Sequence, residues 1–290
     1  MPLSLIFYLT PQTDLPREHL GRQAQGWFLD QVSSVDPDLA EELHNAPGPR
    51  PYTLSGLIPA NTNGSRSGRW HKGGSQQCLR LTVLDTRLEE FVIKRLLPAM
   101  PSALKLWWVE LKIEGCTLDP REHAWAGQTS YADLMQAADS VHQTRQAMLQ
   151  YASPTAFRTG SADIPLPIPG SVFRSYYEKW NAFAPQPLQI DELWVGFAQN
   201  CIKVMRLENL NTCRWRFADG ARGGATGFTG QVGYNLLPQK QVGEWAPFWE
   251  GADRVLQTLS AFSFYCGTGH HTTIGLGQTR PLAESNGKQL

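Results

Sequence analysis

The order of elements along the sequence predicts an α+β fold in which one structural unit occurs twice. Each half reads as strand, helix, strand, strand, helix and strand, which is the ferredoxin-like (RRM-like) arrangement. The chain has 290 residues, enough for two domains that each bury a core of their own. We therefore expect two tandem ferredoxin-like domains, the first at residues 1–126 and the second at residues 127–290.

The first half contains a signal for each element. The stretch "SLIFYLTP" is strand-like and ends at Pro11, and the apolar positions that follow recur at helical spacing. Asp36 followed by Pro37 predicts the start of a short second helix. "YTLSGLI" and "CLRLTVLD" are strand-like, Thr86 and Glu89 form a capping box for the next helix, and "ALKLWWVELKIEG" predicts one long closing strand.

The second half repeats this order. "RQAMLQYASPTAF" is its first strand, and "RWRFA" and "TGQVGYNLL" are strand candidates on either side of a glycine loop. Apolar and aromatic residues at helical spacing mark two helices. The first contains Val172, Phe173, Tyr176, Tyr177 and Trp180, and the second contains Val255, Leu256, Leu259 and Phe262. A glycine-rich stretch then leads into a last strand.

Composition narrows the function classes. The 26 Lys and Arg residues balance the 26 Asp and Glu residues, so the net charge gives no direct sign of a nucleic-acid partner, although a neutral total can hide a basic face. The five cysteines are scattered without a C-x-x-C pair, which favours reduced core thiols over a zinc site or disulfides. We expect no metal and no cofactor. The start of the chain lacks a signal peptide's charged segment and no stretch has the length of a membrane helix, so we expect a cytoplasmic protein without membrane contact.

The stretch "GTGHHTTIGLGQTR" near the C-terminus carries glycines at Gly267, Gly269, Gly275 and Gly277. A chain uses so many glycines where it turns sharply or approaches something closely. Thr272 stands where a dinucleotide-binding motif has its third glycine, so that motif is not met. A string of free backbone N–H groups beside Arg280 would suit a phosphate, whereas the alternative is a tight structural turn with a β-bulge.

Two histidine-containing segments are candidates for chemistry. His44 lies in the last turn of its predicted helix, where the helix dipole favours imidazolium, and Arg50 follows six residues on. Such a histidine can act as general acid or base while the arginine neutralises a phosphate, and the alternative is a histidine that only caps helix carbonyls. His71 lies among basic and aromatic residues that suit single-stranded RNA or else form a solvated loop, namely Arg66, Arg69, Trp70 and Lys72.

A competing chemistry rests on two H-x-T triplets, which begin at His142 and His271. The two-histidine phosphoesterases use this element twice, on a fold that is also a duplicated α+β arrangement. The triplet is short and common by chance, and Arg145 follows the first copy where an apolar strand residue would be expected. The hypothesis of a two-histidine phosphoesterase is therefore the third choice, after the two functions described below.

Four segments occur in an order that resembles a known family. They are "LAEELHNAPGPRPYTLSGL", "YASPTAFRTG…IPLPIPGSVFRSYYEKWNAFAP", "GFTGQVGY" and "FYCGTGHHTTIGLGQTR". Together they resemble the CRISPR-associated repeat-processing endoribonucleases, the Cas-six family. The resemblance implies two RRM-like domains facing each other across a basic cleft, and an enzyme that cuts CRISPR precursor RNA once within each repeat without a metal. It also implies attack by a 2′-hydroxyl on the neighbouring phosphorus, which leaves a 2′,3′-cyclic phosphate and a 5′-hydroxyl.

The resemblance also assigns roles to residues. It places the catalytic histidine on His44, and a lysine of archaeal relatives falls on Arg50 when the chains are aligned without gaps. The tyrosine of those relatives falls on Leu29, so a second proton-transfer group comes from elsewhere or is dispensable. The family's glycine-rich loop maps onto the one described above as an RNA contact. The predicted RNA-binding residues are Gly267, Gly269, His270, His271, Gly275, Gly277, Arg280, Arg158, Arg69 and Lys72.

The partner that this reading implies is CRISPR repeat RNA. A non-catalytic RNA-binding subunit of a CRISPR effector complex, built from the same modules, is the alternative, because a fold alone does not establish activity. Association of an active enzyme with an effector complex, and formation of a homodimer, stay open at this point.

Overall fold

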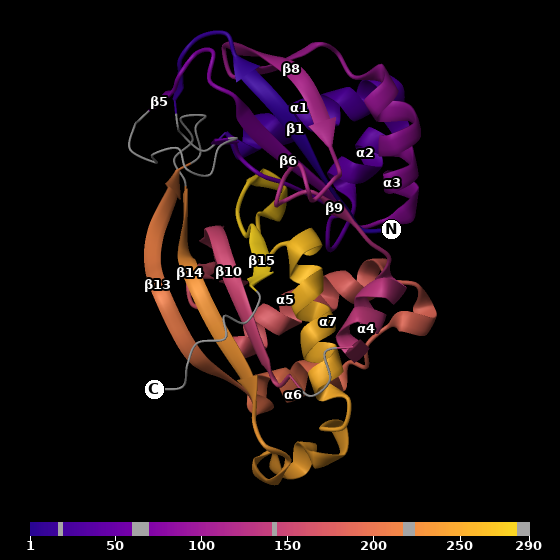
Figure 1. Ribbon diagram of the computed structural model, residues 1–290, viewed down its shortest axis with the longest axis vertical. Coiled ribbons are helices and arrows are strands. Elements are labelled where there is room, and N and C mark those ends of the chain that lie inside the picture. The colour runs from indigo at the N-terminus through magenta and orange to yellow at the C-terminus, as the bar shows by residue number, and fades with distance from the viewer. Residues whose placement is uncertain (17–19, 60–69, 141–143, 217–223, 283–290) are drawn as a thin grey trace. The chain divides into compact units, whose positions relative to one another are not determined.

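The computed structural model describes residues 1–16, 20–59, 70–140, 144–216 and 224–282 of the chain (Figure 1). By internal contacts the chain forms two compact units. Unit 1 comprises Met1–Thr129, Trp215–Gly224 and His271–Leu276, and unit 2 comprises Ser130–Arg214, Ala225–His270 and Gly277–Leu290. Two short segments of the second half thus belong to unit 1, and the division at residues 126/127 stays a prediction. Within the described ranges, none of the helices has both the length and the apolar character that crossing a membrane requires.

The described part of unit 1 contains a sheet of seven strands. Its main elements are β1 (Leu3–Pro11), α1 (Gly21–Val35), α2 (Pro37–Asn45), β3 (Tyr52–Leu54), β6 (Gln77–Val83), α3 (Thr86–Phe91), β7 (Ala103–Leu106) and β8 (Val109–Thr117). Shorter elements are β2 (Leu15–Pro16), β4 (Ile58–Pro59), β5 (Trp70–His71), β9 (Gly127–Gln128), a π-helical turn (Val92–Leu96) and the 3-10 turns Leu97–Ala99 and η6 (Thr272–Ile274). The order β3-β6-β1-β8 places the second, third, first and fourth strands of the repeat side by side, which is the ferredoxin-like order.

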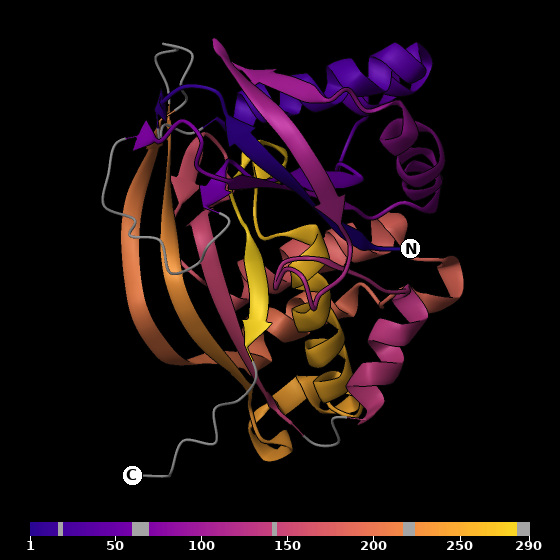
Figure 2. The same ribbon diagram turned by 45° about the horizontal axis from the view of Figure 1, so that its top comes forward.

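The core of unit 1 lies between this sheet and its helices. The side chains of β1 alternate, so that Leu5 and Phe7 belong to one buried cluster and Ile6 belongs to another. The larger cluster includes Trp27 and Phe28 of α1, and the rings of Phe7 and Trp27 meet edge-on with their centroids 5.7 Å apart. Figures 1 and 2 show α1, α2 and α3 gathered on the same side of the sheet.

One predicted strand of unit 1 is instead a hairpin. The stretch "ALKLWWVELKIEG" forms β7 and β8, which pair antiparallel with Leu106 opposite Val109. Trp107 and Trp108 connect them, and Trp107 adopts a positive φ of 61°. Sequence reasoning misses this turn because it lacks the Asn or Gly that two-residue hairpin turns favour. A shift of the apolar alternation between Leu106 and Val109 is the signal that was present.

The helix starts of unit 1 agree with the sequence at one helix and differ at another. The Asp36 carboxylate accepts a hydrogen bond from the Leu39 amide at 3.1 Å, so the predicted start of α2 is confirmed. At α3 the cap is Asp85, whose carboxylate accepts from the Arg87 amide at 3.1 Å. The predicted capping box at Thr86 is therefore displaced by one residue, because the stronger acceptor immediately before it takes the cap position.

Unit 2 repeats the topology of unit 1. Its main elements are α4 (Tyr131–Ser140), β10 (Gln146–Thr155), α5 (Pro169–Phe183), α6 (Leu193–Cys201), β13 (Ile202–Arg216), β14 (Gly224–Leu236), α7 (Ala252–Cys266) and β15 (Thr279–Leu282). Shorter elements are β11 (Phe157–Thr159), β12 (Ala162–Ile164) and the 3-10 turns Gln186–Leu188, Gln239–Gln241 and Gly243–Phe248. The sheet order β13-β14-β10-β15 again places the second, third, first and fourth strands together. The predicted α+β fold of two tandem ferredoxin-like units is thus confirmed.

The core of unit 2 is rich in aromatic side chains. Trp180 of α5 is fully buried and meets Tyr131 of α4 and Phe262 of α7 edge-on, with ring centroids 4.9 and 5.2 Å away. Phe173 of α5 packs against Tyr234 of β14 at 5.3 Å. Figures 1 and 2 show α5 and α7 on one face of the sheet. The helical spacing of these aromatics therefore marks the side of α5 that faces the sheet and α7.

Candidate functional site

His44 lies on the exposed side of α2, in the last helical turn. The buried residues Leu39 and Leu43 hold the opposite side of α2 against the core of unit 1. Arg50 folds back onto the end of this helix, where its Nη2 donates to the His44 carbonyl at 2.9 Å and its Nη1 donates to the Ala46 carbonyl. A cation at the helix C-terminus satisfies these carbonyls and complements the helix dipole. The His44 imidazole is therefore exposed at a helix end whose carbonyls are hydrogen-bonded, and the Arg50 guanidinium lies at the same end.

Tyr52 supports the segment that carries Arg50. It is 1 % exposed, and its hydroxyl accepts a hydrogen bond from Gln25 Nε2 of α1 at 3.1 Å. Burial raises the pKa of Tyr52 above 10, and the hydrogen bond from Gln25 and the charge of Arg50 act in the opposite direction. This phenol therefore stays protonated at neutral pH and ties the start of β3 to α1.

The glycine-rich stretch differs from the expected string of free N–H groups. Most of its amides donate within the protein, from Gly267, Thr268, Gly269, His270, Leu276, Gly277 and Gln278. The expectation is wrong for these residues because the loop folds back on α7, β10 and itself. Both polar backbone groups of Gly277 are used, since its N–H donates to Pro154 and its carbonyl accepts from Thr268. For Thr272 and Thr273 the structure gives no acceptor among the described residues.

The middle of this stretch, residues 271–276, belongs to unit 1 and packs tightly against other segments of that unit. An added Cβ at Gly21, the first residue of α1, would lie 1.8 Å from the Ile274 carbonyl oxygen, so only glycine fits there. Gly275 is buried with φ 97° and faces the backbone of residues 55–56 and the Trp215 ring. Close approach of backbone to backbone therefore accounts for these two glycines, and the predicted contact of Gly275 with RNA stays a prediction.

A buried lysine holds the beginning of the glycine-rich stretch. Lys179 of α5 is 9 % exposed, and its ammonium donates to the carbonyls of Cys266, Gly267 and Gly269 at 2.9, 3.1 and 3.4 Å. These carbonyls lie at the C-terminal end of α7, where a positive charge is favourable. Sequence reasoning missed this residue, although a lysine three positions after Tyr176 on the apolar face of α5 was a usable signal.

Buried hydroxyl groups continue this arrangement in unit 2. The Thr268 hydroxyl contacts the Tyr176 hydroxyl at 2.6 Å and the Thr279 hydroxyl at 2.7 Å, so it joins α5 to β15. The Tyr151 and Tyr234 hydroxyls lie 2.9 Å apart. Burial raises the pKa of Tyr151, Tyr176 and Tyr234 well above 10, so these tyrosines act as neutral hydrogen-bonding groups.

We expect Lys179→Met to lower the free energy of unfolding by roughly 2–4 kcal/mol, because three carbonyls lose their donor while the side-chain volume is kept. Burial lowers the pKa of Lys179 below 10.5. At pH values between the lowered pKa of the folded state and the 10.5 of the unfolded state, Lys179 is protonated more fully in the unfolded chain than in the folded one. Over that range this residue makes the free energy of unfolding increase with pH. Denaturant unfolding from neutral to alkaline pH should show that rise in the wild type and not in the variant.

The exposed lysine of β13 supplies the matched control for this prediction. Lys203→Met removes the same charge from the surface and should leave the unfolding free energy within about 0.5 kcal/mol of the wild type. Equal stability of Lys179→Met and Lys203→Met across the pH range would contradict the role given to Lys179.

The remaining predicted RNA-binding residues lie in several places. In unit 2, Arg158 and His270 both approach Oδ1 of Asp163, from Nη1 at 3.7 Å and Nε2 at 3.3 Å, and Arg280 Nε donates to Gln150 at 2.7 Å. In unit 1, the exposed Lys72 pairs with Asp14 at 2.8 Å. The structure thus brings Arg158 close to His270 and Arg50 close to His44.

Some candidates are buried or fall outside the described residues. Arg66, Arg69 and His142 lie outside the described residues. His71 is 5 % exposed and belongs to β5, so it does not lie in the solvated loop considered for it. Among the residues that the structure describes, no group of three or more His, Cys, Asp or Glu side chains is arranged to hold a metal ion.

Comparison with known proteins gives a consistent result. Residues 1–136 match the family model of the CRISPR Cas6 N-terminal domain, and residues 149–279 match that of the CRISPR-associated endoribonuclease Cas6. No curated protein sequence matches the chain.

Solved structures resemble the chain over nearly its whole length. A product complex of Cas6 (TTHB231) is 27% identical, with 97% of this chain and 100% of that one covered and a TM-score of 0.79. Another structure of that protein, from Thermus thermophilus, is 26% identical with a TM-score of 0.69, at 97% and 98% coverage. A product complex of Cas6 (TTHA0078) is 25% identical, at 97% and 99% coverage, with a TM-score of 0.74. The chain belongs to the CRISPR-associated endoribonuclease Cas6 family.

Proposed function

We propose that this protein binds CRISPR precursor RNA and cleaves it within each repeat by metal-independent transphosphorylation. The ribose 2′-oxygen attacks the adjacent phosphorus, a new 2′-O–P bond forms, and the P–O5′ bond breaks. One proton leaves the 2′-hydroxyl and one is delivered to the departing 5′-oxygen. The products are a 2′,3′-cyclic phosphate on the upstream fragment and a 5′-hydroxyl on the downstream fragment.

The observation that carries this proposal is the exposed His44 at an end of α2 that Arg50 closes. An imidazole can move a proton near neutral pH, and such general acid–base catalysis contributes about 10²–10⁴ in rate. Two of the donors of Arg50 are held by backbone carbonyls, which leaves its remaining N–H groups for a phosphate. A guanidinium is a poor base, so the proposed part of Arg50 is to stabilise charge on the phosphorus and not to accept a proton.

Relatives support the choice of substrate. The similar structures of Cas6 (TTHB231) and Cas6 (TTHA0078) are product complexes, and the family model carries the description of an endoribonuclease. We propose CRISPR repeat RNA as the partner of this chain on that basis. In the glycine-rich stretch, the amides of Thr272 and Thr273 are the groups we assign to a phosphate, because most of the other amides of the stretch are already bonded within the protein.

We expect cleavage of repeat RNA to proceed at an unchanged rate in excess EDTA. In the proposed mechanism His44 supplies one proton-transfer group and Arg50 supplies a fixed cation, and neither role requires a bound metal. A gel assay of labelled repeat RNA with EDTA, and then with added Mg²⁺, measures this. Activity that disappears in EDTA and returns with Mg²⁺ would contradict the mechanism.

The same assay distinguishes the proposed nuclease from the alternative function. A non-catalytic RNA-binding subunit of an effector complex would shift the RNA in a native gel and leave it intact under both conditions. Size-exclusion chromatography of the protein with and without RNA tests whether it forms a homodimer.

A further inference from the structure

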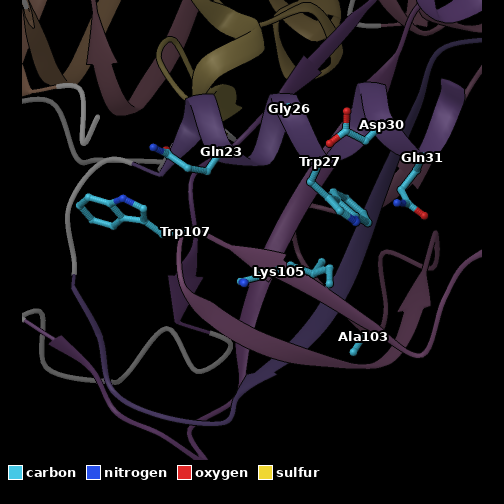
Figure 3. Close-up of a pocket in the computed structure, with 9 residues that line it drawn as sticks. Gln23, Gly26, Trp27, Asp30, Gln31, Ala103, Lys105 and Trp107 are labelled. Carbon is cyan, nitrogen blue, oxygen red and sulfur yellow. The ribbon is translucent and has the colours of Figure 1, made fainter. Parts of the chain in front are cut away.

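Unit 1 contains a pocket that is separate from the end of α2. It has a volume of about 420 Å³ and lies between α1 and the β7–β8 hairpin. Figure 3 shows Gln23, Trp27, Asp30 and Gln31 along α1 on one side and Lys105 and Trp107 of the hairpin on the other. This volume is within the range of pockets that hold small ligands.

Two buried polar atoms of this pocket have no partner. The Gln23 Oε1 and the Trp27 indole N–H are buried and make no hydrogen bond with any described residue. Trp27 is 7 % exposed and is backed by Phe7, so its ring is fixed in place. Buried polar groups are nearly always hydrogen-bonded, so each of these atoms indicates a ligand that brings the complementary group. Figure 3 shows Gln23 at the end of the pocket near Trp107 and Trp27 farther along α1.

Trp107 gives the pocket an aromatic wall, and its backbone adopts a strained conformation to do so. A bulky residue at φ 61° is an outlier, and glycine or asparagine is usual at such a turn position. The ring of Trp107 contacts that of Trp108 in a tilted arrangement, with centroids 4.3 Å apart and planes 41° apart. Strained residues that persist in a fold are concentrated at functional sites, and a tryptophan ring is a platform on which bases of every kind stack.

The charges of the pocket indicate what kind of ligand it takes. Asp30 and Lys105 contribute one charge of each sign, and neither side chain makes an ion pair or hydrogen bond with another described residue. A balanced lining does not select a polyanion. This pair of opposite charges suits a neutral base whose edge carries both hydrogen-bond donors and acceptors, together with a single phosphate near Lys105.

We propose that this pocket binds one unpaired nucleotide of the RNA, with the base stacked on Trp107 and its edge hydrogen-bonded to Gln23. This inference rests on the proposed function, because the nucleotide belongs to the RNA that the protein processes. The pocket would hold a base outside the site of cleavage and add to the affinity for RNA.

The test uses short homopolymeric ribo-oligonucleotides, which contain no repeat. Binding is measured by fluorescence anisotropy in the wild type, Trp107→Gly and Phe248→Ala. Trp107→Gly removes the platform while glycine accepts the positive φ, so the dissociation constant should rise about tenfold. Phe248 is an aromatic residue of unit 2 that is 39 % exposed and does not line the pocket, so Phe248→Ala should stay within about twofold of the wild type.

A second measurement locates the bound base. A 5-bromouridine oligonucleotide is irradiated with the wild-type protein, and the crosslinked tryptic peptide should be residues 106–112. If Trp107→Gly fails to fold by circular dichroism, Gln23→Ala replaces it, because this change removes a partly buried group that has no bonding partner at its oxygen. Unchanged affinity in the folded variant, or crosslinks confined to other peptides, would overturn the inference. Since neither probe contains a repeat, a failure to cut repeat RNA refutes the proposed function and leaves this test intact.

Discussion

His44→Ala should slow single-turnover cleavage of repeat RNA by about 10²-fold or more, while the affinity for RNA changes little. In the proposed mechanism the imidazole acts in the transition state, where a proton is moving, and contributes little to holding the RNA. Alanine favours helix, and His44 is exposed, so the variant should keep its fold. Rates measured with protein in excess over labelled RNA, together with a gel shift on the same samples, separate the loss of chemistry from a loss of binding.

Asn45→Ala is the matched control for this prediction. Asn45 is the next residue of α2 and is also exposed, so its replacement disturbs the same helix end without removing an imidazole. It should cleave within about threefold of the wild type, as expected for a surface change without a part in the reaction. A near-wild-type rate for His44→Ala would move proton transfer to another histidine, with His270 and His271 the next to replace.

The parts of the fold that could be predicted are those fixed by local signals. The end of β1 at Pro11, the start of α2 at Asp36 and the aromatic face of α5 each depend on residues within one or two turns of chain. The two-fold repetition follows from the order of these elements. His44 could be placed at a helix end for the same reason, because a capping residue and a helical length locate that end.

Other features depend on contacts between distant segments. Residues 271–276 join unit 1 although they lie far along the second half, and the contact of Ile274 with Gly21 spans most of the chain. No local sequence pattern indicates that contact, so the sequence alone predicts that the glycine-rich stretch is a free loop. Lys179 gains its role in the same way, from carbonyls that follow it by almost ninety positions along the chain. Trp107 lies within one predicted long strand, and it reaches the pocket beside α1 only because a hairpin forms there instead.

The last prediction concerns the attacking group. If the nucleophile is the 2′-hydroxyl of the RNA, a single 2′-deoxyribose immediately 5′ of the scissile phosphate should abolish cleavage at that phosphate. Binding should persist, because phosphate contacts and stacking supply most of the affinity and one hydroxyl supplies little of it. A paired assay on all-ribose and single-deoxy repeat RNA, with a gel shift and analysis of the product ends, measures both effects.

The control RNA carries its deoxyribose on the 3′ side of the same phosphate. That sugar provides only the leaving 5′-oxygen, so this RNA should be cut close to the rate of the all-ribose RNA and should yield a 2′,3′-cyclic phosphate. An enzyme that activates water would cut both deoxy RNAs, because it makes no use of the 2′-hydroxyl, and a pure binding subunit would cut neither. Cleavage of the first RNA at the same phosphate, or a 3′-hydroxyl on the upstream fragment, is incompatible with attack by the RNA's own ribose. Loss of cleavage in the first RNA alone therefore assigns the nucleophile to the substrate and leaves to the protein the tasks of holding it in line and moving two protons.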